Sequence, residues 1–379
     1  MMAYFSEEHK LFRKSVQGFI HREINSLVDQ WEAEEMFPAD QLYKKMGNEG
    51  FLGLSHSSSY GGLDLDFWYT VIWIEELGKI EAGGIPMSIT TQTEIVTPII
   101  ARYGSPVLKE QYLRPAIMGD FIGALAVTEP EAGSDVSRIA TMAHESGDYY
   151  IIDGRKSYIT NGSIADFVVT LCRTSSGPSA NSMSLIIVPT STPGFTAVKN
   201  YKKLGNLCCD HAELIYESVK VPKENVIGLE NMGYNILLDS FQRERLILGI
   251  LACAQAKRIL NRTKHYARER VVFGQRLIDQ QSIAFSLVNL ETEVEFLQQM
   301  AYHCADLFIS DNECTKEMAM VKLKAGKLLR LVADECLQML GGFGYMEDIQ
   351  MIRAYRDTRA MAIAGGSTET MQHILKKFL

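Results

Sequence analysis

The sequence predicts an α+β protein made of three successive blocks: a helical N-terminal domain (residues 1–122), a central β domain (123–230) and a C-terminal helical bundle (231–379). Helical periodicity of apolar and charged residues runs from Glu7 to about Gly119 and returns from Asn231 onward. Residues 149–228, in contrast, form short runs rich in β-branched and aromatic residues, which favour strands. These two changes of pattern separate the three blocks.

The composition is that of an ordinary globular protein, with 46% hydrophobic and 22% charged residues. The net charge of −8 argues against a nucleic-acid-binding protein, which usually carries a basic stripe. The charged start MMAYFSEEHKLFRK lacks the apolar core of a signal peptide, and no apolar run approaches the roughly 18 residues of a membrane span. Because the seven cysteines include no CxxC pair, we expect reduced, buried thiols in a cytoplasmic protein without a metal site.

Two hairpins are expected in the β domain. In YYIIDGRKSYITNG, the Asp153-Gly154 pair separates two β-rich runs, as a hairpin turn does. Further along, ADFVVTLCRT and MSLIIVPT flank the polar loop SSGPSANS, which predicts the second hairpin. AELIYESVKVP is a later strand that ends at Pro222.

Two stretches could bind a planar polar ligand, and each also has a plainer interpretation. In AVTEPEAGSD (126–135), the Thr128 hydroxyl and backbone N–H groups could hold the edge of a ring, although composition favours a Pro/Gly loop in which Asp135 is a cap. In YITNG (158–162), Tyr158 could stack on a planar ligand or pair with an aromatic side chain across the sheet, which is commoner.

Two glycine-containing segments at predicted helix ends are candidate anion sites. In ARERVVFGQRLIDQQ (267–281), Arg270 could bind a phosphate, but the segment also fits a helix C-terminus with Gly274 just after the last turn. In LQMLGGFGYMED (337–348), the Gly-x-Gly lacks the preceding strand that a phosphate-binding fingerprint needs.

The most informative stretch is SFQRERLILG (240–249), where Glu244 falls on an apolar helical stripe. At helical spacing the stripe contains Leu237, Phe241, Leu248 and Leu251. Burial on such a face disfavours the charged carboxylate and raises its pKa, which suits a general base. The plainer interpretation is an acid paired with a neighbouring arginine.

The adjacent glycines of AIAGGSTETM (362–371) interrupt helical sequence near the end of the chain. Gly365 and Gly366 lack side chains where a packed domain normally has them. They indicate either a helix cap or a backbone that approaches another group closely.

The segments VTEPEAGSD, YITNG, ERVVFGQ, QMLGGFGYMED and GGSTE resemble the signature segments of the acyl-CoA dehydrogenase family, in its order and at about its spacing. The resemblance covers essentially the whole chain and implies a central β-barrel-like or sandwich domain and a C-terminal four-helix bundle. It also implies non-covalently bound FAD and a homotetramer in which subunits share the cofactor site. The matching positions that would contact FAD are Val127, Thr128, Gly133, Ser134, Tyr158, Thr160, Arg270, Phe273, Gln281, Gln338, Gly342, Ser367 and Glu369.

The same resemblance implies oxidation of an acyl thioester, in which a carboxylate removes the α proton and a hydride passes from the β carbon to the flavin. Most of the family carries this base in a C-terminal E-G-T sequence, where this chain has Gly365. The isovaleryl- and long-chain branch carries it in an earlier E-R-L sequence, which matches Glu244–Leu246. We therefore expect Glu244 to be the base and the Gly365 backbone N–H to bind the thioester carbonyl.

Two departures from the family's pattern bear on substrate and partner. The stacking position, often Trp or Phe, is Tyr158, and LCCDH (207–211) replaces an R-G-S-x-T loop. A side branch of the family oxidises aminoacyl groups, notably prolyl, on acyl carrier proteins, sometimes with oxygen as acceptor. The carrier is thus CoA or an acyl carrier protein, and the acceptor is an electron-transfer flavoprotein or molecular oxygen. A non-catalytic or monooxygenase-type flavoprotein is the alternative on this fold.

Overall fold

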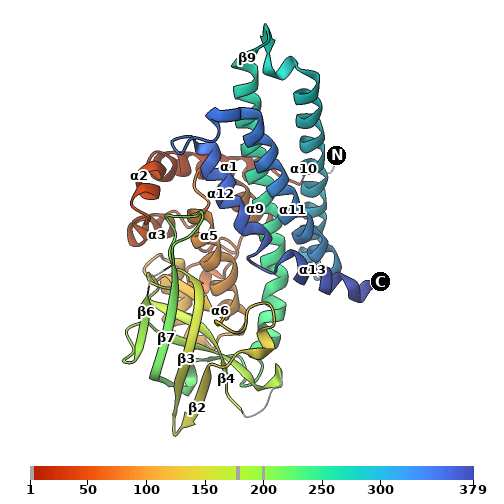
Figure 1. The fold of residues 1–379 in the computed structure, drawn as a ribbon. Coiled ribbons are helices and arrows are strands. Elements are labelled where there is room, and N and C mark those ends of the chain that lie inside the picture. Colours follow the sequence, from red (N-terminus) through yellow and green to blue (C-terminus); the bar gives the residue numbers. More distant parts are fainter. Residues whose placement is uncertain (1–3, 176–179, 199–200) are drawn as a thin grey trace.

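The computed structural model describes residues 4–175, 180–198 and 201–379, and its elements follow the predicted order of helices, strands and helices (Figure 1). The N-terminal helices are α1 (Glu7–Ile20), α2 (Val28–Ala33), α3 (Ala39–Asn48), α4 (Phe67–Leu77), α5 (Gly84–Thr90), α6 (Thr97–Tyr103), α7 (Pro106–Leu108) and α8 (Arg114–Ile117). A π-helical turn, η3 (Thr91–Val96), joins α5 to α6. The predicted N-terminal helical domain is therefore confirmed.

The middle of the chain forms a mixed sheet of eight strands within the described residues. Its strands are β1 (Gly123–Ala126), β2 (Met142–Ser146), β3 (Tyr149–Thr160), β4 (Phe167–Arg173), β5 (Met183–Pro189), β6 (Phe195–Val198), β7 (His211–Pro222) and β8 (Val226–Ile227). Their order is β6-β7-β3-β2-β4-β5-β8, and β1 pairs with β4 in parallel. Side chains alternate along β4, so Phe167 and Val169 join a core with α6, whereas Val168 packs with Tyr216 on the other face.

One predicted hairpin is confirmed and the other is wrong. β4 and β5 are antiparallel across the loop SSGPSANS, of which residues 176–179 lie outside the described residues. Asp153-Gly154 is not a turn, because it lies inside the continuous strand β3, where the pairing with β7 shifts register. There the Asp153 carboxylate accepts a hydrogen bond from the Ser218 N–H (2.7 Å). The turn falls instead at Gly147-Asp148, between the antiparallel strands β2 and β3.

The C-terminal part is a bundle of long helices that lie side by side (Figure 1). Its elements are α9 (Gly233–Glu269), the hairpin β9 (Val271–Val272) and β10 (Gln275–Arg276), α10 (Gln281–Ile309), α11 (Thr315–Leu340), α12 (Gln350–Thr358) and α13 (Thr368–Leu375). Phe273 and Gly274, with φ of 52° and 79°, form the two-residue turn of that hairpin. Gly274 therefore does not follow the last turn of α9, contrary to one sequence interpretation.

Helices from both ends of the chain share one hydrophobic core. Trp73 and Leu77 of α4 pack in the same cluster as Leu246 and Ile250 of α9, which fixes the helix that carries Glu244. All seven cysteines are free and buried, as predicted. Among the described residues, no helix has both the length and the apolar character needed to cross a membrane.

Candidate active site

Glu244 lies in α9 on the predicted apolar face. Leu237 and Leu251 of that face are buried, and Phe241, Leu248 and the Glu244 side chain itself are partly buried. Burial raises the pKa of Glu244 above its ordinary value, because the nearby charges of Lys322 and Arg245 offset the loss of water only in part. The carboxylate is therefore a stronger base than an exposed one.

Gly365 lies directly against the Glu244 carboxylate. A Cβ atom built on Gly365 would be 3.1 Å from Glu244 Oε1 and would overlap Leu248 Cδ1. Gly365 also has a φ of 63° and Gly366 a φ of 92°, in the region that favours glycine. The two residues form the turn before Ser367, which is the N-cap of α13, so of the two interpretations of the glycine pair the structure shows the close approach.

The backbone N–H of Gly365 is available to a ligand. Among the described residues, none accepts a hydrogen bond from it, whereas the preceding Ala364 N–H is bonded to the Ala360 carbonyl (2.9 Å). The Gly365 N–H is a hydrogen-bond donor, and the Glu244 carboxylate beside it is a base. This is the arrangement that removal of a proton next to a carbonyl group requires.

Two buried cations, Lys322 and Arg245, lie near Glu244, and sequence reasoning missed the first of them. Lys322 of α11 is 2% exposed, and its ammonium donates to the carbonyls of Met361 (2.8 Å) and Gly366 (3.2 Å). Arg245 is 7% exposed and donates to the Gln242 side chain (3.2 Å). The signal for Lys322 was available, because at helical spacing it shares a face with apolar residues of α11 such as Met318, Ala325 and Leu329.

The loop 127–135 is held against β3 by hydrogen bonds from consecutive residues. Lys156, which is fully buried, donates to the Val127 carbonyl (3.0 Å) and to Glu129 Oε1 (2.8 Å). The neighbouring Ser157 N–H donates to the Thr128 carbonyl (2.9 Å). The positions of Val127 and Thr128 are thus fixed by a buried ion pair that sequence reasoning did not identify.

The rest of this loop is open. Nothing lies within 4 Å of a Cβ built on Gly133, and Ser134 beside it is exposed. Asp135 caps the next short helical turn through the Ser137 N–H (3.2 Å), as the plainer interpretation of the stretch predicted.

Tyr158 and Thr160 lie at the end of β3 close to this loop. Tyr158 has a φ of 60° in a bulge between β3 and β7, so it is not a regular cross-strand partner. Its side chain is 61% exposed, and its ring packs on that of Tyr201 with 4.8 Å between centroids. Thr160 Oγ1 lies 3.4 Å from His211 Nε2. An exposed aromatic ring beside an open loop can stack on a planar ligand.

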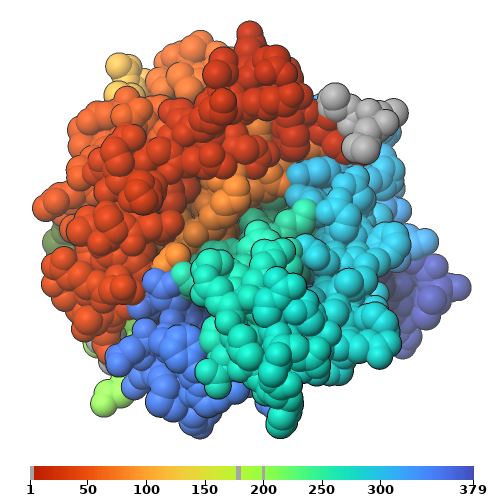
Figure 2. Space-filling view, turned by 90° about the horizontal axis from the view of Figure 1, so that it is seen from above, coloured from red at the N-terminus to blue at the C-terminus, as the bar shows by residue number. Residues whose placement is uncertain are grey.

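Of the remaining candidate cofactor residues, Ser367 and Glu369 lie at the start of α13 beside the Gly365 turn, and the others lie at the end of the bundle that carries the hairpin after α9. Arg270 and Gly342 line a cavity of about 480 Å³ together with Tyr266 and Phe343. Figure 1 shows the hairpin after α9 at the top of the bundle, and Figure 2 looks onto this end; the side chain of Phe273 is 96% exposed. Gln281 at the start of α10 and Gln338 near the end of α11 are exposed as well.

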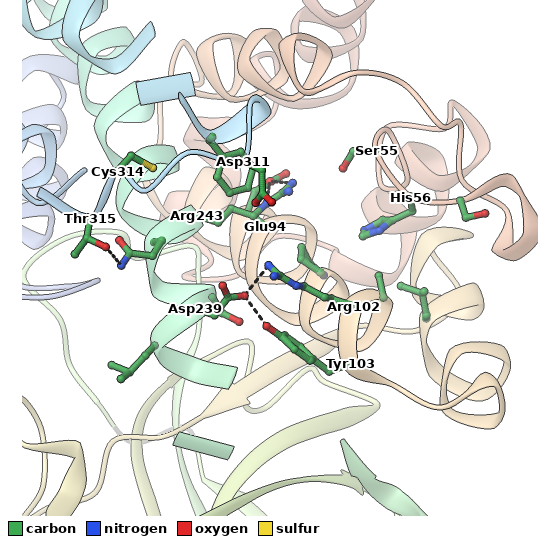
Figure 3. A pocket seen from close by; sticks show the side chains of 18 of the residues that line it. Ser55, His56, Glu94, Arg102, Tyr103, Asp239, Arg243, Asp311, Cys314 and Thr315 are labelled. Carbon is green, nitrogen blue, oxygen red and sulfur yellow. Dashed lines mark hydrogen bonds and ion pairs between the residues drawn. The ribbon is translucent and has the colours of Figure 1, made fainter. Parts of the chain in front are cut away.

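A second cavity, of about 760 Å³, lies on another face of α9 (Figure 3). Arg243 Nη2 forms a 2.6 Å ion pair with Glu94 there, and Asp239 accepts hydrogen bonds from Arg102 (2.8 Å) and Tyr103 (2.7 Å). Its lining residues, all in the described part of the chain, include neither Glu244 nor Gly365. Successive helical residues point about 100° apart, so Arg243 and Glu244 face different surroundings.

Comparisons with known proteins match the whole chain to one family. Models of the N-terminal, middle and C-terminal domains of acyl-CoA dehydrogenase match residues 6–120, 124–219 and 231–379. An acyl-CoA dehydrogenase of Bacillus subtilis is 32% identical over 376 residues, 99% of each chain. The structure of an acyl-CoA dehydrogenase from Geobacillus kaustophilus has a TM-score of 0.95 and 36% identity, covering 100% of this chain and 99% of its own. The structure of the prolyl acyl carrier protein oxidase AnaB has a TM-score of 0.93 and 27% identity, covering 99% of both chains.

Proposed function

Because the chain belongs to the acyl-CoA dehydrogenase family of FAD-dependent oxidoreductases, we propose that it oxidises an acyl thioester with Glu244 as the catalytic base. The observation that carries this proposal is the approach of the Glu244 carboxylate to the backbone of Gly365. The Glu244 carboxylate lies beside Gly365, the position at which most of the family carries the catalytic base. Because glycine has no side chain, this position leaves room for the Glu244 carboxylate.

Glu244 and Gly365 divide the first step between them. A Glu244 oxygen accepts the α proton, and the electron pair of the broken C–H bond moves onto the carbonyl oxygen. The Gly365 N–H donates a hydrogen bond to that oxygen and stabilises its negative charge. FAD, when bound, supplies the acceptor for the hydride that leaves the β carbon.

The residues present fit FAD at two separate places. By the resemblance, one group would hold the part of FAD near Glu244: Val127, Thr128, Gly133, Ser134, Tyr158, Thr160, Ser367 and Glu369. A second group lies at the far end of the bundle, where Arg270 and Gly342 line one cavity: Arg270, Phe273, Gln281, Gln338 and Gly342. Helical rise places Arg270 about 40 Å from Glu244 along α9, farther than one extended dinucleotide reaches. The second group would therefore serve the cofactor of a neighbouring subunit.

This arrangement favours the expected homotetramer. An almost fully exposed Phe273 at the tip of a hairpin is typical of a side chain that a partner covers. Sedimentation of wild type and Phe273→Ser tests this, with weaker self-association of the variant expected; a monomeric wild type that binds FAD fully would contradict it.

CoA is the favoured carrier of the acyl group. The two acyl-CoA dehydrogenases compared above share 32% and 36% identity with this chain, against 27% for the prolyl carrier-protein oxidase. The expected electron acceptor is an electron-transfer flavoprotein, with oxygen as the alternative.

Anaerobic mixing of the yellow holoenzyme with acyl-CoAs and with prolyl- and other aminoacyl carrier proteins tests the proposal. Loss of flavin absorbance with an acyl-CoA supports it, and loss only with a carrier-protein thioester assigns the other carrier. Readmitted air shows whether oxygen is an acceptor. A yellow protein that no thioester bleaches would favour the non-catalytic or monooxygenase-type alternative.

A further inference from the structure

Lys322 is a buried cation whose hydrogen bonds reach the turn around Gly365. Its ammonium donates to the Met361 carbonyl (2.8 Å) at one side of the turn and to the Gly366 carbonyl (3.2 Å) at the other. The side chain comes from α11, so the turn is tied to a long helix of the bundle instead of only to its own neighbours.

These two bonds bear on the direction of the Gly365 N–H. Gly365 lies between the two carbonyl groups and, with Gly366, has a positive φ that few residues adopt. A glycine pair has wide backbone freedom, so a donor N–H within it is aimed only if neighbouring peptide groups are fixed. Lys322 fixes the peptide groups that begin at Met361 and at Gly366, which lie on either side of the Gly365 N–H along the chain.

Lys322 also acts on Glu244 through its charge. The charged groups that act on the Glu244 carboxylate are Lys322 from α11 and Arg245 from α9, and both favour its ionised form. In return, Glu244 favours the charged ammonium, although burial still lowers the pKa of Lys322 to about 8. A base must be ionised before it can accept a proton, so this attraction helps Glu244 in its proposed role.

A purely structural role would not require a charge at this position. Two carbonyls can be bonded by a neutral amide, whereas burial of an ammonium carries a desolvation penalty. A buried lysine between a glycine turn and a partly buried carboxylate is explained if its charge acts on that carboxylate.

We infer that Lys322 is a positioning residue of the active site, which aims the Gly365 N–H at the thioester carbonyl and brings a positive charge to the vicinity of the Glu244 carboxylate. This inference rests on the proposed function. It adds to that function a third side chain that touches neither the substrate nor the reacting atoms.

The test is proton exchange without oxidation. An acyl-CoA with sulfur in place of the β carbon has no hydride to lose, so its α protons can exchange with D₂O only through reversible removal and return of a proton. Nuclear magnetic resonance follows this exchange for wild type, Glu244→Gln, Lys322→Met and Lys322→Gln as a function of pH. Lys324→Met is the matched control, because Lys324 lies on the same helix, is exposed and pairs with Glu293.

Lys322→Met is expected to slow exchange about 100-fold at neutral pH, as misplacement of a donor does. The acid limb of its pH profile should move to higher pH, since the charge that lowers the pKa of Glu244 is lost. The FAD content of Lys322→Met should equal that of wild type. The exchange rate and pH profile of Lys324→Met should also equal those of wild type. Lys322→Gln keeps a hydrogen-bond donor but lacks the charge. Its acid limb should therefore also move to higher pH, and its exchange rate should fall less than that of Lys322→Met.

Wild-type exchange rates and an unmoved acid limb in folded Lys322→Met and Lys322→Gln would overturn the inference. Slower exchange with an unmoved acid limb in both variants would also overturn the inference, because this is the result that a purely structural role of Lys322 predicts. No exchange in wild type, or full exchange in Glu244→Gln, would instead overturn the proposed function, so the two failures are distinguishable.

Discussion

The substitution Gly365→Ala tests the close packing of the turn against α9. An alanine there must adopt a φ of 63°, which costs about 1–2 kcal/mol for an L residue. Its methyl group would also overlap Leu248 Cδ1, and overpacking of this kind costs about 1–3 kcal/mol. The free energy of unfolding should therefore fall by about 2–5 kcal/mol.

The same substitution should also slow catalysis. The new methyl group would lie 3.1 Å from Glu244 Oε1 and push the carboxylate aside, and a displacement of about 1 Å costs about 100-fold in rate. Urea unfolding measures the stability, and anaerobic flavin bleaching by an acyl-CoA measures the rate.

Gly366→Ala is the matched control. It has the same backbone cost at a φ of 92°, but its Cβ would meet the flexible end of Met371 (2.5 Å to Cε) and not Glu244. It should lose stability with a much smaller loss of rate. A Gly365→Ala protein with unfolding free energy within 1 kcal/mol of wild type and an unchanged bleaching rate would refute this account of the turn.

Three further predictions follow from other buried groups. Lys156→Met should leave the buried Glu129 without its ion-pair partner, destabilise the protein by about 3 kcal/mol and weaken FAD binding at least tenfold; fluorescence titration with FAD that gives the wild-type affinity would contradict it. Glu94→Gln should destabilise by about 3 kcal/mol because Arg243 stays charged without its carboxylate, and an unchanged melting temperature would refute it. Burial, aided by the charge of Arg243, lowers the pKa of His56 from 6.5 to about 3, so the unfolded chain binds the proton more readily and stability should fall as pH drops from 6.5 toward 3. In His56→Gln, the free energy of unfolding measured with urea should decline less over this pH range. An equally steep decline in the variant would contradict the low pKa of His56.

The sequence pattern predicted the order of helices, strands and helices, but not every turn. The pair Asp153-Gly154 has the local chemistry of a hairpin turn, yet Asp153 bonds to Ser218 on the neighbouring strand and the pair becomes a bulge. Phe273-Gly274, interpreted as following a helix end, is such a turn. A dipeptide carries no information about the distant strand that pairs with it, and this pairing decides between a turn and a bulge.

The candidate site was only partly readable for the same reason. Glu244 was identifiable from its apolar stripe, and its approach to Gly365 agrees with the resemblance. Lys156 and Lys322 were missed because each acquires its partners only through folding, although the apolar face of α11 already indicated that Lys322 is buried. Lys156 meets Glu129 across the loop, and Lys322 meets carbonyls of a turn that follows α12.

The central claim is that Glu244 removes the α proton, and anaerobic stopped-flow bleaching of Glu244→Gln tests it most directly. Loss of a general base costs about 10²–10⁴-fold, so the variant should bind FAD and the acyl-CoA as wild type does but bleach at least 100-fold more slowly. It should also be no less stable at neutral pH, because burial raises the pKa of Glu244 and the folded state therefore disfavours its charge above that pKa. Full bleaching of the variant at the wild-type rate would contradict the account.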